Sequence, residues 1–267
     1  MTQQRFTADY AVLGVGSIAE AIVTGLCRDA DAPPRIVLSP RGHARATRLA
    51  ARFPTVRVAP DNQDAASSAG TVLLCLRPQD AVEGLASVRL DAGQRVVSVM
   101  ASLTSTELAE LIGPVAEISR GIPATAVSSR QGFTPVYPAG SAAQRLFDEL
   151  GGSLVLSSER LLDATSVASA TVAAHLTSLE TVSAWLARQG VDADESRRLL
   201  ASVFAGATAG FAHSADFAEL ARQHATPGGL NERLATALRR AGVYETVERG
   251  LDELLGRPPA RHPGQAG

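Results

Sequence analysis

The stretch HATPGGLNERLATALRR, residues 224–240, carries two adjacent glycines where the sequence predicts the start of a helix. Thr226 suits the N-cap and Pro227 the first helical position, and Leu230 and Leu234 follow at helical spacing. A helix start offers free N–H groups and the positive end of the helix dipole, and glycine lets a ligand approach the backbone. The stretch therefore predicts an anion-binding helix start, with simple capping of one helix as the alternative.

A second glycine pattern lies near the beginning of the chain, in VLGVGSIAEAI. Gly14, Gly16 and Ala19 fit G-x-G-x-x-A between an expected strand at 10–14 and an expected helix at 17–29. The first glycine permits a tight turn, the second lets the backbone approach a pyrophosphate, and the small third residue lets helix and strand pack closely. The pattern predicts a dinucleotide site, and a tight turn without a ligand is the alternative.

The end of the second expected strand bears on the choice of coenzyme. An NAD site usually carries an acidic residue there, against the ribose hydroxyls, whereas this chain has LSPRGHAR. Ser39 stands in place of the acid, and Arg41, His43 and Arg45 follow. A hydroxyl and a guanidinium suit a 2′-phosphate, so we expect NADP(H) to be preferred over NAD(H). The alternative is that Arg41 is an ordinary solvated arginine.

The elements that must position these motifs change character along the chain. Short β-branched runs alternate with helical segments in the first part, which predicts an α/β fold with a parallel sheet covered on both faces. After residue 157 the pattern is helical, rich in Ala and Leu, with a break near Gly190–Val191. We expect a Rossmann-type NADP-binding domain over 1–157, a helical domain over 158–256 and a disordered tail over 257–267. The expected strands are 10–14, 35–39, 56–59, 71–76, 96–101, 116–120, 132–137 and 153–157.

Composition excludes several classes of protein. A net charge of -2 and an aromatic content of 4% argue against nucleic-acid binding, and no apolar run reaches membrane-spanning length. The first residues lack the apolar core of a signal peptide, so we expect a cytoplasmic protein in which Cys27 and Cys75 are free thiols. All 25 basic residues are arginine, which excludes a Schiff-base lysine and a P-loop lysine. No spacing of His, Cys and acidic residues predicts a metal site.

The motifs resemble those of the pyrroline-5-carboxylate reductase family over roughly residues 9 to 255. The resemblance rests on GVGSIAEAI, SPRGHAR, Asn62, LCLRP and TPGGLNERL, in that order. It implies a Rossmann-type domain followed by a helical dimerisation domain, and hence a homodimer or a higher homo-oligomer. It also implies hydride transfer from NAD(P)H to a cyclic imine carboxylate, which gives proline.

The resemblance also implies which residues would bind the two ligands. The imine carboxylate would lie at the helix start of the opening stretch, with Thr226 and Asn231 as candidates to assist protonation of the nitrogen. The substrate-binding residues would be Thr226, Gly228, Gly229, Leu230, Asn231 and His175, although a lone helical histidine more often serves packing. The coenzyme-binding residues would be Gly14, Gly16, Ser17, Ile18, Ala19, Ser39, Arg41, Asn62, Leu76, Arg77, Pro78, Met100 and Ala101.

The substrate side departs from the family pattern. Leu230 and Asn231 stand where the family has two threonines, Ala124 where it has asparagine and Ala174 where it has tyrosine. Glu232 then follows in the first turn. Pyrroline-5-carboxylate is the expected substrate, and a different cyclic imine or an NADP-binding homologue without turnover is the alternative. A related 3-hydroxyacid dehydrogenase ranks low because those enzymes rely on a lysine, which this chain lacks.

Overall fold

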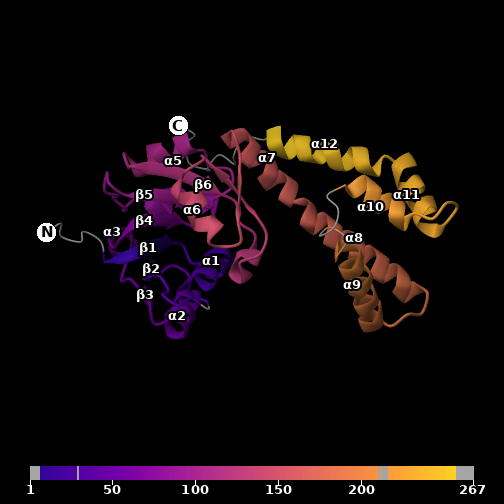
Figure 1. Cartoon of the computed structure of the whole chain (residues 1–267), viewed down its shortest axis with the longest axis horizontal. Helices are drawn as coiled ribbons and strands as arrows, with labels where there is room; N and C mark the ends of the chain where they lie inside the picture. Colours follow the sequence, from indigo (N-terminus) through magenta and orange to yellow (C-terminus); the bar gives the residue numbers. More distant parts are fainter. Residues whose placement is uncertain (1–6, 29, 210, 212–215, 257–267) are drawn as a thin grey trace. The chain divides into compact units, whose positions relative to one another are not determined.

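The computed structural model describes residues 7–28, 30–209, 211 and 216–256 (Figure 1). The expected tail over 257–267 lies outside these residues. Two compact units form the chain, one ending at Ser166 and the other beginning at Val167. Among the described residues, no helix is both long and apolar enough to cross a membrane.

The first unit is built on an eight-stranded sheet with the order β3-β2-β1-β4-β5-β6-β7-β8. The strand order reverses at β1, because β2 and β3 lie on one side of it and β4 to β8 on the other. The carboxyl ends of β1, β2 and β4 therefore lie at the same edge of the sheet, where α/β proteins bind nucleotides. The strands are β1 Ala8–Leu13, β2 Ile36–Leu38, β3 Val56–Val58, β4 Ala69–Leu74, β5 Arg95–Ser98, β6 Glu117–Gly121, β7 Thr134–Tyr137 and β8 Ser153–Val155.

One pair of strands departs from the expected parallel arrangement. β7 lies antiparallel to β6, with Arg120 opposite Tyr137, whereas every other pair in the sheet is parallel. A parallel return needs a long crossover, usually an α-helix. The connection from β6 to β7 holds only the short 3-10 helix η2 (Thr125–Ser129), so the expected parallel arrangement holds for the other pairs and not for this one.

Helices cover both faces of the sheet, as the sequence pattern predicts. Alternating residues of β1 show the two faces, because Val12 belongs to one buried apolar cluster and its neighbour Leu13 to the other. Residues of α1, α2 and α6 pack in the first cluster, and residues of α3, α4 and α5 in the second. These helices are α1 Ser17–Cys27, α2 His43–Arg52, α3 Asn62–Ser67, α4 Ala81–Leu85, α5 Ser105–Ile112 and α6 Ala142–Asp148.

A fully buried arginine ties the start of α7 (Glu159–Ser169) to the sheet. Arg120 of β6 donates through Nη1 to Glu159 at 2.7 Å and through Nη2 to Asp163 at 3.0 Å. Burial alone would raise the pKa of Glu159, but hydrogen bonds from Arg120 and Ser105 outweigh it and hold that pKa below its usual range. Removing Arg120 would leave two carboxylates without their shared partner.

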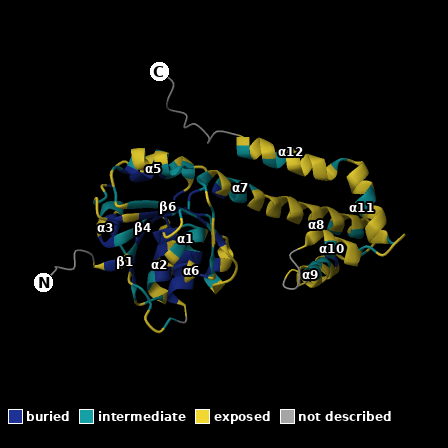
Figure 2. Cartoon of the chain, turned by 45° about the horizontal axis from the view of Figure 1, so that its top comes forward, coloured by how far each residue is buried: buried dark blue, intermediate teal, exposed yellow. Residues whose placement is uncertain are grey.

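Helices are the only regular elements longer than one turn among the described residues of the second unit, and many of its large apolar side chains are exposed. Ser196 is the one buried residue among the described part of this unit, and Figure 2 shows the resulting contrast with the first unit. The predicted break is confirmed, because α8 ends at Arg188, α9 begins at Ala193 and Gly190 has φ +94°. The helices are α8 Thr171–Arg188, α9 Ala193–Ala209, α10 Phe217–His224, α11 Leu230–Arg240 and α12 Val243–Gly256.

Candidate functional site

The turn between β1 and α1 depends on Gly14. Its φ of +88° is one that L side chains rarely adopt, and a Cβ there would stand 2.8 Å from the carbonyl oxygen of Cys75. Its N–H donates to the Oγ of Ser39 at 2.8 Å. The sequence predicts that the Ser39 hydroxyl faces a coenzyme phosphate, but Ser39 is fully buried and its hydroxyl accepts a hydrogen bond from the glycine turn instead.

Gly16 opens the N-terminus of α1. It occupies the N-cap position without a side-chain cap, and a Cβ built on it would meet nothing within 4 Å. The first N–H groups of a helix have no intrahelical acceptor, so those of Ser17, Ile18 and Ala19 are available to an anion. This open cradle fits the pyrophosphate of a dinucleotide, which needs close approach to the backbone at a positive helix end.

A third glycine, which the sequence motifs did not indicate, allows the neighbouring loop to approach closely. Gly42 has φ +85°, and a Cβ on it would lie 2.5 Å from the carbonyl oxygen of Val15. The Val15 N–H in turn donates to the carbonyl oxygen of Arg41 at 3.3 Å. The position of Gly42 directly before α2 was a signal in the sequence that could have identified it. The loop after β1 and the loop after β2 can approach this closely only because Gly42 has no side chain.

The charges at this edge of the sheet are paired. Asp80, the last residue of η1 (Pro78–Asp80), accepts from Nε of Arg77 at 2.6 Å and lies 3.4 Å from Nη2 of Arg41. Arg45 pairs with Glu20 of α1 at 3.1 Å and reaches the Oγ of Ser17 at 3.3 Å. The guanidinium groups predicted from the sequence are therefore present together, but each is already matched by a carboxylate.

These loops enclose a cavity of about 390 Å³ at the carboxyl ends of β1, β2 and β4. Five of its lining residues were expected to bind coenzyme, namely Gly14, Gly16, Arg41, Leu76 and Arg77, and the other five were not. The ten lining residues are Gly14, Val15, Gly16, Arg41, Gly42, Arg45, Cys75, Leu76, Arg77 and Asp80.

The remaining residues expected to bind coenzyme lie outside the lining of this cavity. Asn62 begins α3 and donates its amide to the carbonyl oxygen of Gly84 at 3.1 Å. Pro78 begins η1, and Met100 and Ala101 follow β5, with Met100 buried. Their roles toward a coenzyme stay predictions.

Both cysteines are free thiols, as predicted. Cys75 lies in the cavity lining, and burial raises the pKa of its thiol to about 12. A thiol with so high a pKa is not a nucleophile near neutral pH. We therefore expect no covalent chemistry from Cys75.

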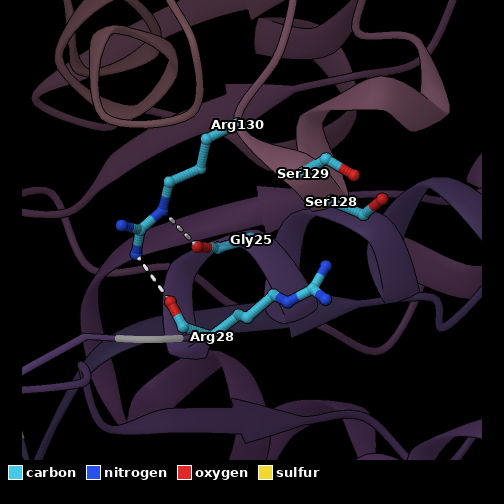
Figure 3. A pocket seen from close by; sticks show the side chains of 5 residues that line it. All are labelled: Gly25, Arg28, Ser128, Ser129 and Arg130. Atoms are coloured by element: carbon cyan, nitrogen blue, oxygen red, sulfur yellow. Dashed lines mark hydrogen bonds between the residues drawn. The ribbon is translucent and has the colours of Figure 1, made fainter.

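The opposite end of α1 has a smaller cavity, of about 150 Å³, which Figure 3 shows from close by. Arg130 donates Nε to the carbonyl oxygen of Gly25 at 2.8 Å and Nη2 to that of Arg28 at 3.1 Å. A cation on the last carbonyls of a helix is a favourable C-terminal cap. This end of α1 is closed by the protein itself, whereas the end at Gly16 is open.

The glycine pair of the opening stretch lies outside the helix that it precedes. α11 begins at Leu230 with Gly229 as its N-cap, so the prediction that Thr226 caps the helix was wrong. The Gly229 N–H donates to the carbonyl oxygen of Thr226 at 2.8 Å, and Gly228 has φ +71°. Residues 226–229 form a type II turn, with Pro227 at its second position and a positive φ at its third. The residues expected to start the helix therefore belong to this turn.

Polar groups of this turn are held by the protein's own side chains. The Gly228 N–H donates to a carboxylate oxygen of Glu232 at 2.6 Å. The Asn231 amide donates to the carbonyl oxygen of His224 at 2.8 Å, so its N–H group stabilises the loop. Leu230 is 82% exposed at the first helical position. The free N–H groups of the first turn of α11 remain, as in any helix.

His175 is not brought to this turn by any contact of the described residues. It lies in α8 and meets Phe204 of α9 edge-on, with ring centroids 5.4 Å apart. Ala174 precedes it in α8, and Ala124 is the N-cap of η2. The described residues hold no cluster of His, Cys and acidic side chains that could bind a metal ion.

Comparison with known proteins finds a family match in each part of the chain. Residues 9–102 match the family "NADP oxidoreductase coenzyme F420-dependent", and residues 159–258 match "Pyrroline-5-carboxylate reductase dimerisation". Pyrroline-5-carboxylate reductase 2 of Bacillus subtilis (strain 168) is 27% identical over 257 residues, covering 92% of this chain and 92% of that relative. Over most of its length the chain is therefore similar to pyrroline-5-carboxylate reductases.

Solved structures of the pyrroline-5-carboxylate reductase family share the fold. The enzyme of Streptococcus pyogenes has a TM-score of 0.78 at 19% identity, covering 93% of this chain and 96% of that chain. The Plasmodium falciparum enzyme with NADP bound has a TM-score of 0.74 at 15% identity, covering 93% and 95%. The predicted Rossmann-type domain with a C-terminal helical domain is thereby confirmed.

Proposed function

We propose that this chain is a member of the pyrroline-5-carboxylate reductase family, and that it is an NADPH-dependent imine reductase that converts 1-pyrroline-5-carboxylate to proline. The observation that carries the proposal is the open cradle at Gly16, in a chain that matches reductase families in both of its parts. NADPH, when bound, supplies the hydride for the C=N carbon. The protein has to bind both ligands, orient them and exclude water.

The residues around the cradle support NADPH as the preferred coenzyme. The open N–H groups at the start of α1 suit the pyrophosphate, and Arg41 follows the second strand in place of an acidic residue. Arg41 is 43% exposed and lines the same cavity as Gly16. A planar guanidinium in this place suits a 2′-phosphate better than a ribose hydroxyl.

The turn before α11 is our proposed seat for the imine carboxylate. The first turn of α11 presents free N–H groups and a positive dipole end, and a Cβ at Gly228 would meet no protein atom within 4 Å, which leaves room for a ligand beside the turn. We assign the Thr226 hydroxyl to hydrogen-bond the imine nitrogen. Asn231, whose N–H group already holds the carbonyl oxygen of His224, orients the turn instead of donating a proton.

We also propose that the protein is a homodimer or a higher homo-oligomer. Large apolar side chains of α8 and α9 are exposed, including Leu176 at 59%, Trp185 at 51% and Val203 at 54%. Exposed apolar faces of this kind usually mark a protein interface. The match of residues 159–258 to a dimerisation family supports a second copy of this chain as the partner.

A second candidate substrate is a cyclic imine without a carboxylate. The Gly228 N–H is already occupied by Glu232, and the exposed apolar side chain of Leu230 stands at the first turn of α11. A negative charge in the seat disfavours a negatively charged ligand. These two features favour a neutral substrate over 1-pyrroline-5-carboxylate.

The deciding experiment follows NADPH oxidation at the nicotinamide absorbance with 1-pyrroline-5-carboxylate, its six-membered-ring analogue and the uncharged 1-pyrroline. We expect turnover of 1-pyrroline-5-carboxylate with formation of proline. Faster turnover of 1-pyrroline would support the second candidate. NADPH binding without oxidation by any of the three imines would refute both candidates and leave a coenzyme-binding homologue.

A variant tests the assignment of the coenzyme. We expect Arg41→Ala to weaken NADPH binding about tenfold, which is the scale of one charge-assisted hydrogen bond, and to leave NADH binding within twofold. Arg57→Ala is the matched control, because Arg57 forms a similar exposed ion pair with Asp64 at 3.3 Å outside the cavity lining. An equal loss for both coenzymes would refute the assignment of Arg41 to the 2′-phosphate.

A further inference from the structure

Asp80 lies between the two arginines that face the dinucleotide cavity. One of its oxygens, Oδ2, accepts from Nε of Arg77 at 2.6 Å and lies 3.4 Å from Nη2 of Arg41. The Asp80 side chain is 17% exposed, whereas Arg41 is 43% and Arg77 is 71% exposed. The carboxylate is therefore the most enclosed member of the group, and its charge is screened less than theirs.

The charges of this cavity are compensated before any ligand arrives. Its lining contains three guanidinium groups, those of Arg41, Arg45 and Arg77. Asp80 faces two of them, and Glu20 lies 3.1 Å from Nε of the third. A 2′-phosphate carries about two negative charges, and binding to Arg41 would place them close to Asp80. Arg41 would then have to leave Asp80 or be shared by both anions.

We propose that Asp80 is a coenzyme-specificity residue, which weakens the hold of Arg41 on the 2′-phosphate of NADPH and so narrows the preference for NADPH over NADH. This inference rests on the proposed function, because it assumes that the cavity binds the adenosine part of a dinucleotide. NADH has no 2′-phosphate and leaves the pair of Arg41 and Asp80 undisturbed. The repulsion is therefore felt by one coenzyme and not by the other.

The substitution Asp80→Asn separates the charge from the shape. Asparagine has nearly the same size and keeps an acceptor oxygen for Nε of Arg77, but it carries no charge. We expect NADPH to bind about three- to tenfold more tightly, the scale of one partly exposed charge pair acting on a phosphate, and NADH to change less than twofold. The affinity of NADPH should also depend more steeply on salt, because more positive charge is left for the phosphate.

The measurement is direct binding by isothermal titration calorimetry with the full chain, so it does not depend on knowing the imine. NADPH and NADH are compared with adenosine 2′,5′-bisphosphate and AMP, a pair that differs only in the 2′-phosphate. Asp64→Asn is the matched control, since Asp64 pairs with Arg57 at 3.3 Å outside the cavity lining. This control should leave all four affinities unchanged.

The possible results distinguish the inference from the function on which it rests. Tighter NADPH and bisphosphate binding, with NADH and AMP unchanged, supports it. An unchanged or weaker NADPH affinity in Asp80→Asn, or an equal gain for both coenzymes, overturns the role of Asp80 and leaves the proposed function standing. If the wild-type chain binds neither coenzyme, the proposed function fails and takes this inference with it.

Discussion

The two glycines of the first motif should respond differently to alanine. At Gly14 the φ of +88° strains any L side chain, and the new methyl would stand 2.8 Å from a backbone oxygen at the end of β4. At Gly16 the backbone is extended, with φ -91° and ψ -169°, and a methyl would meet no protein atom within 4 Å. We therefore expect Gly14→Ala to damage the fold, and Gly16→Ala to damage only the cradle.

The geometry sets the size of each effect. For Gly14→Ala, left-handed strain of about 1–3 kcal/mol adds to the cost of displacing β4, which predicts a loss of about 3 kcal/mol in the free energy of unfolding. For Gly16→Ala, the gain from a stiffer unfolded chain and the loss of a preferred N-cap residue nearly cancel, within about 0.5 kcal/mol. Its methyl group should nevertheless weaken NADPH binding about tenfold or more, because it occupies the approach to the N–H groups of α1.

Urea unfolding followed by far-ultraviolet circular dichroism measures the stability, and titration calorimetry measures the coenzyme affinity. Gly113→Ala is the control for strain alone, because Gly113 has φ +75° but nothing within 4 Å of its Cβ position. It should lose about 1–3 kcal/mol from backbone strain and bind NADPH normally. Normal NADPH binding by Gly16→Ala would refute the cradle, and an unfolding free energy of Gly14→Ala equal to that of Gly113→Ala would refute the collision with β4.

Two further predictions concern buried groups of the first unit. Arg120→Met should cost about 3–5 kcal/mol of unfolding free energy in urea, because Glu159 and Asp163 lose their shared buried partner, and a loss below about 1 kcal/mol would contradict this. Because the pKa of Glu159 is lowered in the folded state, its contribution to the free energy of unfolding is complete above the ordinary pKa near 4.5 and is lost as the pH falls below it. The variant Arg120→Met lacks a partner that lowers this pKa, so its stability should fall less steeply in acid than that of the wild type. Cys75, whose thiol pKa is raised to about 12, should resist alkylation at pH 8 in the native protein and react in urea, and rapid native modification would show that the thiol is not enclosed.

Local patterns in the sequence were enough to predict the fold class and part of the lining of the proposed coenzyme site. The alternation of strands and helices depends on side-chain periodicity, and the glycine pattern before α1 depends on backbone constraints within a few residues. Both are local properties, so Gly14 and Gly16 could be selected without coordinates, and Arg41 could be selected from its place after the second expected strand. Arg77 was expected only from the family resemblance. The helix break near Gly190 could also be predicted from the sequence, because glycine commonly follows the last residue of a helix.

Contacts between distant segments were decided only by the tertiary structure. The sequence predicts Ser39 as a coenzyme-binding residue, but the fold buries it against Gly14, which lies 25 residues away in the chain. Gly42 matters because Val15 lies against it, and Asp80 because Arg41 approaches from another loop. Ion pairs and close packing contacts join residues that are far apart in the sequence. The periodicity of apolar residues and the spacing of motifs depend only on near neighbours, so they cannot predict such pairs.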